Sequence, residues 1–92
     1  METLLKLLQR DFPHLTFKAG ADFFWSPKEQ SVYFTNTQKP SDIWSLLHET
    51  SHGLLGHKTF TTDFELLQIE LAAWEKAKEL ANHYQITIDT DH

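Results

Sequence analysis

The sequence lacks cysteine entirely, which excludes disulfides, thiolate metal ligands and thiol catalysis. A metal ion would therefore be held by histidine and carboxylate side chains, and the chain carries six histidines. Basic residues are also scarce, because eight lysines and arginines stand against 13 aspartates and glutamates, for a formal net charge of −5. This balance disfavours a surface that follows nucleic-acid phosphates, so we expect no nucleic-acid partner.

Long apolar runs are missing as well. No run approaches the roughly 20 apolar residues that a membrane-spanning helix needs, so we expect no membrane partner. The leucine-rich start is interrupted by Lys6 and Arg10, and no small-residue cleavage site follows it, which disfavours a signal peptide. With no low-complexity tract and no linker, residues 1–92 are expected to form a single domain of a cytoplasmic protein.

Apolar spacing and turn residues predict an α+β fold. Pro13 ends a first helix that carries Leu4, Leu5 and Leu8 on one side. Aromatic and β-branched runs then predict three strands, whose short connections favour antiparallel pairing. A capping box, Thr62 to Glu65, opens the last helix. The expected elements are a helix over residues 1–11, strands over 15–17, 23–25 and 31–35, and helices over 40–53 and 62–83.

An HExxH motif, His48-Glu49-Thr50-Ser51-His52, lies inside the helix expected over residues 40–53. Residues four apart on a helix share one face with Cβ atoms about 5–6 Å apart, so both imidazoles can bind one ion. Glu49 lies about 100° around the helix from His48, where its carboxylate can reach a water molecule on that ion. Two neutral imidazoles suit zinc, and a neighbouring carboxylate suits a general base.

A catalytic zinc site needs a third protein ligand. The pattern HExxHxxGxxH is not met, because Leu55 and Lys58 occupy its glycine and third-histidine positions and Met1 is the only methionine. The last helix offers three glutamates instead. Of these, the capping box explains Glu65, and a place on the polar face explains Glu75.

Glu70 is the remaining glutamate, and its position on the helical wheel supports it as the third ligand. An ionised carboxylate that is buried among apolar residues without a partner costs several kcal/mol, and a bound metal ion would offset this cost. We therefore predict that His48, His52 and Glu70 bind the metal. At 100° per residue, the apolar residues that share the face of Glu70 are Leu66, Leu67, Ala73, Trp74, Ala77, Leu80 and Ala81.

The motif His48-Glu49-x-x-His52, followed 18 residues later by Glu70-Leu71-Ala72-Ala73, resembles the HExxH…ExxA pattern of gluzincin zinc metallopeptidases. Because the chain is short, it is most similar to the minigluzincins, and ImmA/IrrE-type metallopeptidase domains share the motif. The resemblance implies one Zn²⁺ per chain, bound by His48, His52 and Glu70, with Glu49 as the catalytic general base and acid. It also implies a minimal zincin fold, with a three-stranded antiparallel sheet over an active-site helix and a glutamate helix.

The resemblance further implies that a peptide or protein substrate binds along an edge strand by β-augmentation. The segment with Ser31, Val32, Tyr33, Phe34 and Thr35 is the best match, because it directly precedes the active-site helix. Larger relatives also place a Tyr or His near the zinc to stabilise the oxyanion, and Tyr33 and His57 are the candidates here.

One departure from the family pattern concerns Trp74, which directly follows the ExxA motif. Many gluzincins have Asp or Asn at this position, where it orients a ligand histidine. The indole of Trp74 can donate a hydrogen bond but cannot accept one, so the support for that imidazole must come from another group.

The function predicted from these residues is hydrolysis of peptide bonds by a zinc metalloendopeptidase, with Glu49 activating a zinc-bound water. Two alternatives stay open. One is a zinc-stabilised module that binds a peptide or regulates a partner, and the other is a latent peptidase whose C-terminal tail, Ile86–His92, covers the zinc. An edge strand and such a tail also offer two routes to self-association.

Overall fold

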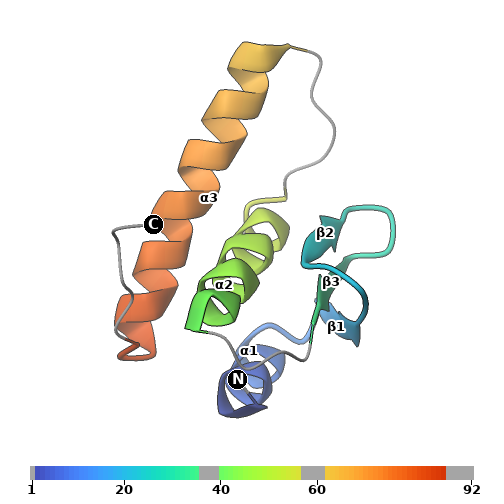
Figure 1. The fold of residues 1–92 in the computed structure, drawn as a ribbon, viewed down its shortest axis with the longest axis vertical. Helices are drawn as coiled ribbons and strands as arrows, with labels where there is room; N and C mark the ends of the chain where they lie inside the picture. Colours follow the sequence, from blue (N-terminus) through green and yellow to red (C-terminus); the bar gives the residue numbers. More distant parts are fainter. Residues whose placement is uncertain (1, 36–39, 57–61, 87–92) are drawn as a thin grey trace.

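The computed structural model describes residues 2–35, 40–56 and 62–86 (Figure 1). The predicted α+β class is confirmed, and the element boundaries differ from the predicted ones by one or two residues. In chain order the elements are α1 (Glu2–Asp11), β1 (Thr16–Ala19), β2 (Phe24–Ser26), β3 (Ser31–Phe34), α2 (Pro40–Leu54) and α3 (Asp63–His83).

Helix α2 lies at the centre of the molecule, between the sheet and α3 (Figure 1). It packs on β2 and β3 on one side and on α3 on the other, and α3 runs antiparallel to it. Helix α1 contacts β1 and lies at the bottom of the view in Figure 1, where its Leu4 and Leu8 join the core. The buried core cluster draws on both sides of α2 and contains Leu4, Leu8, Val32, Leu46, Leu47, Ala77, Leu80 and Ala81.

The sheet is mixed, with β3 as its middle strand. β1 pairs with β3 in parallel and β2 pairs with β3 antiparallel. The prediction of a fully antiparallel sheet is therefore wrong, and so is the expectation that Ser31–Thr35 forms an edge strand. The substrate-binding role assigned to that segment fails for the same reason, because hydrogen-bonded neighbours occupy both edges of β3.

The path of the chain at Gly20 explains this topology. The Gly20 N–H donates to the carbonyl of Phe34 at 2.8 Å, so the chain passes the end of β3 directly after β1. A Cβ at Gly20 would lie 3.0 Å from the Tyr33 ring, which means that a side chain would crowd this passage. The chain then returns as β2 along the other edge of β3, instead of pairing with β1.

Hydrogen bonds outside the helical pattern stabilise both ends of α3. The side-chain oxygen of Thr62 accepts a hydrogen bond from the Glu65 N–H at 3.1 Å, which confirms the predicted N-terminal cap. At the other end, the Tyr84 hydroxyl donates to Asp11 at 2.7 Å and links α3 to α1. Ile86 packs against the core. The rest of the tail that the latent interpretation requires lies outside the described residues.

In residues 2–35, 40–56 and 62–86, no helix combines the length and the hydropathy that crossing a bilayer requires.

Gly53 allows α2 to approach β2 closely. It is buried, and a Cβ at this position would lie 2.9 and 3.1 Å from two ring atoms of Trp25 and 3.3 Å from Leu15. The Trp25 ring thus occupies the space that any larger residue after His52 would need. This contact fixes the distance between the HExxH helix and the strand beside it.

We expect Gly53→Ala to lower the free energy of unfolding by about 1–3 kcal/mol, measured by urea denaturation, because overpacking against Trp25 outweighs the helix propensity gained. In a Trp25→Leu background the same substitution should cost much less, since the ring that it meets is gone. Equal costs in the two backgrounds would show that Trp25 is not the reason for glycine at this position.

Candidate metal centre

Three side chains of the HExxH motif gather on α2. His48 and His52 are buried one turn apart and Glu49 is half-buried. One ligand atom from each of the three lies within 4.8 Å of the others, so this group could hold a metal ion. The sequence spacing predicts that His48, Glu49 and His52 lie close together, and the structure confirms this.

The side chains of residues 47–52 lie on different sides of α2, and each side packs against a different part of the molecule. Leu47 and Thr50 are fully buried, and the Ser51 hydroxyl donates to the Leu47 carbonyl at 2.7 Å. Glu49 lies toward β2, where the backbone N–H of Trp25 hydrogen-bonds its carboxylate. The two histidines turn toward α3.

Glu70 of α3 meets both imidazoles. Its Oε2 lies 3.0 Å from His48 Nε2 and its Oε1 lies 3.3 Å from His52 Nε2, while the two Nε2 atoms are 3.2 Å apart. The Glu70 side chain is 40% exposed, so the expectation of a carboxylate buried in an apolar stripe is only partly right. Ala73 and Ala77, further along α3, are the fully buried part of that stripe.

Hydrogen bonds alone do not satisfy the two imidazole nitrogens and the two oxygens of Glu70. An ionised carboxylate only accepts, so both imidazoles would have to donate their Nε2–H groups to Glu70. Two N–H groups would then face each other across the 3.2 Å between the ring nitrogens of His48 and His52. A cation resolves the conflict, because it accepts a lone pair from each imidazole and from the carboxylate. The donor chemistry and the spacing therefore both fit a metal ion.

The carboxyl group of Glu49 is electrostatically perturbed. Burial, and to a lesser extent the negative charge of Glu70, raise the pKa of Glu49, and the hydrogen bond from the Trp25 N–H opposes both, so the pKa lies at about 7. A nearby metal ion would favour the ionised form and oppose the rise in pKa. The carboxyl group thus lies next to the two imidazoles without being solvated like a surface acid.

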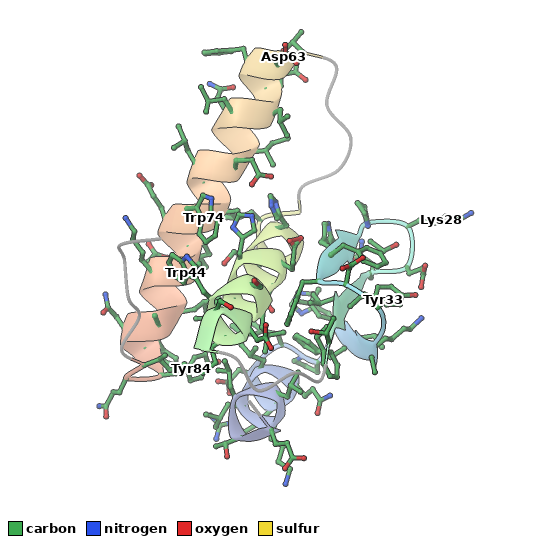
Figure 2. The ribbon with its side chains drawn as sticks, viewed as in Figure 1. Lys28, Tyr33, Trp44, Asp63, Trp74 and Tyr84 are labelled. Atoms are coloured by element: carbon green, nitrogen blue, oxygen red, sulfur yellow. The ribbon has the colours of Figure 1, made fainter. Side chains whose placement is uncertain are left out.

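Aromatic rings cover the histidines on the side of α3. The ring of Trp74 stacks on that of His48, with centroids 3.8 Å apart and planes at 29°. Trp44 lies 4.8 Å from Trp74, also between α2 and α3 (Figure 2). The His52 ring meets His48 edge-on at 4.7 Å. The prediction from sequence missed this stack, although Trp44 precedes His48 by four residues and Trp74 follows Glu70 by four.

Tyr33 does not reach the metal centre. Alternation along β3 places Val32 in the core and Tyr33 on the opposite face, away from α2 (Figure 2). There the Tyr33 ring stacks on Phe24 at 4.3 Å and its hydroxyl donates to Glu29. The expectation that Tyr33 stabilises the oxyanion is therefore wrong. The other candidate, His57, lies outside the described residues.

No family model, curated protein or solved structure matches the chain. The similarity to gluzincins therefore rests on the HExxH…ExxA residues alone. The geometry of the described residues shows a group, His48, Glu49 and His52, that could hold a metal ion.

Metal binding should raise the melting temperature of the protein. With free Zn²⁺ at 100 times its Kd, the expected stabilisation is about 2.7 kcal/mol, which scanning calorimetry detects as a concentration-dependent shift. His48→Asn should abolish the shift, whereas His83→Asn, which changes an exposed histidine at the end of α3, should keep it. A full shift in His48→Asn, or its loss in His83→Asn, would contradict metal binding at this centre.

Proposed function

We propose that this protein is a zinc-dependent metallopeptidase, in which His48, His52 and Glu70 bind zinc and Glu49 is the general base. The observation that carries the proposal is the close approach of the three groups: the two imidazole Nε2 atoms lie 3.2 Å apart, and each lies 3.0–3.3 Å from one oxygen of the Glu70 carboxylate. Atoms bound to one tetrahedral zinc ion at about 2.0–2.1 Å lie about 3.3 Å apart. Two histidines and one glutamate are also a ligand set that catalytic zinc sites use.

The number of ligands favours a catalytic site over a structural one. Three ligands from the chain leave the fourth position to water, whereas structural sites are closed by four protein ligands. When bound, zinc would lower the pKa of that water to about 7 and polarise the carbonyl of the substrate.

Glu49 supplies the proton transfers. Its carboxylate takes the proton from the attacking water and returns it to the amine that leaves. The hydrogen bond from the Trp25 N–H supports the orientation of the Glu49 carboxylate, and partial burial keeps bulk water from competing for its oxygens. The sheet thus positions the base, while the two helices position the ligands.

The topology supports β2 as the strand that binds substrate. In the part of the chain that the structure describes, β2 pairs with β3 along one edge only. The backbone N–H of Trp25, at the middle of β2, hydrogen-bonds the Glu49 carboxylate, so the edge of β2 opposite β3 borders the candidate metal centre. An extended peptide that adds to the edge would bring its backbone carbonyls next to the general base.

The first test measures metal content by native mass spectrometry. We expect one zinc per chain in the wild type and its loss, or a weakening by at least about 100-fold, in Glu70→Ala, since one of three ligands is removed. Glu75→Ala, on the exposed face of the same helix, is the matched control and should retain zinc. Zinc retained equally in all three proteins would mean that Glu70 is not a ligand.

The second test separates a general base from a fourth ligand at Glu49. As a base, Glu49→Gln should keep zinc but lose about 100- to 10,000-fold in the rate of peptide cleavage, followed by mass spectrometry on a mixture of unstructured peptides. As a ligand, the same variant should lose zinc. Cleavage by Glu49→Gln at the wild-type rate would refute the proposed mechanism. A zinc-loaded wild type without any cleavage would favour the zinc-stabilised binding module.

A further inference from the structure

We propose that Trp74 is a positioning residue for His48, and that its indole face sets the plane of the imidazole that binds the metal. The proposal rests on the zinc ligation proposed above. In most metal sites a hydrogen-bond acceptor orients the ligand histidine, and the stacked ring adds a contact on the face of the imidazole.

The face of the His48 ring packs against the face of the Trp74 ring. The 3.8 Å between the centroids of His48 and Trp74 brings the two rings into van der Waals contact, with planes only 29° from parallel. The ring of Trp44 lies 4.8 Å from that of Trp74 in the same helix interface, tilted by 34°. Glu70, one turn before Trp74 on α3, meets the edge of the same imidazole at Nε2. One helix thus contacts His48 at both its face and its ligating atom.

A ligand imidazole needs such a contact because its ring rotates easily. The torsion about the Cβ–Cγ bond of histidine has broad minima, and Nε2 lies off this axis, so rotation swings the lone pair away from an ion. A hydrogen-bond acceptor commonly stops this motion, but the Trp74 indole is only a donor. Its flat face restricts the same torsion, since any large rotation of the His48 ring would drive its edge into the indole.

Metal binding should strengthen the stack. An imidazole that donates its lone pair to a divalent cation becomes electron-poor, and electron-poor rings are attracted to the negative face of an indole. Because coupling between two interactions is reciprocal, a contact that zinc strengthens also increases the affinity for zinc. This argument ranks the side chains at position 74, with Trp best, Phe weaker and an aliphatic residue weakest.

The experiment compares Trp74→Leu, Trp74→Phe and Trp44→Leu with the wild type by competition for Zn²⁺ with a chromophoric chelator. We expect Trp74→Leu to raise the Kd for zinc by about 10- to 100-fold, as removal of an orienting partner does. Trp74→Phe should recover most of the affinity. Trp44→Leu makes the same substitution in the same interface, so it controls for lost packing and should change the Kd by less than about threefold.

A spectroscopic signature distinguishes orientation from packing. In the Co²⁺ form, Trp74→Leu should shift and broaden the visible absorption bands, which depend on ligand geometry, while Trp44→Leu should leave them at the wild-type positions. In wild-type protein, NMR should show the ring protons of His48 shifted upfield by the Trp74 ring current, a measurement that stands even if a variant does not fold. Ring protons of His48 without this shift would overturn the proposal.

The remaining outcomes of these experiments also test the role of Trp74. Zinc bound by the wild type and by Trp74→Leu with equal affinity would refute the role of Trp74 and leave the proposed ligands intact. Equal losses in Trp74→Leu and Trp44→Leu would reduce Trp74 to a packing residue. A wild type that binds no zinc would refute the proposed function itself, so the two failures are distinguishable.

Discussion

The antiparallel packing of α3 on α2 is the contact on which the candidate site depends. Both helices present residues at intervals of four along their shared interface, with Trp44, His48 and His52 on α2 and Glu70 and Trp74 on α3. A rotation of α3 by one residue, about 100°, would take the carboxylate away from both imidazoles. The small buried side chains further along α3 allow the two helices to approach, so the core that stabilises the domain also aligns the site.

This arrangement divides the site between local and tertiary structure. Two imidazoles one turn apart need only a helix, and the neighbouring Glu49 needs only the same turn. Glu70, by contrast, reaches them only if a second helix packs with the correct rotation. The hydrogen bond from Trp25 to Glu49 requires a third element, the sheet, on the other side of α2. The candidate site thus draws on α2, α3 and the sheet together.

What could be predicted from the sequence follows the same division between local and tertiary structure. The helices and the HExxH group could be predicted because their spacing is a property of consecutive residues. The wheel also separated Glu70 from Glu65 and Glu75, since an acid among apolar residues marks the face that turns inward. It overestimated the burial of Glu70, because a wheel shows direction around the axis and not where along it the neighbouring helix ends.

Strand order and ring contacts could not be predicted in this way. The short connections between the strands indicated that consecutive strands pair antiparallel. Instead, the chain passes the end of β3 at Gly20, and β2 pairs with the edge of β3 opposite β1. The role expected of Tyr33 failed for a different reason, because alternation along β3 places Tyr33 on the face away from α2. The stack of Trp74 on His48 depends on the rotation of one helix against another, which no pattern within either helix records.

The distribution of tryptophan has a consequence for how the molecule can be observed. The chain has three tryptophans, and all of them belong to the surroundings of α2. Trp25 covers Gly53 on the side of the sheet, Trp44 is part of α2, and Trp74 covers His48 on the side of α3. The ultraviolet emission of this protein is therefore an intrinsic optical reporter of a single helix, seen from both of its sides, and α1 and β1 contribute no indole to it.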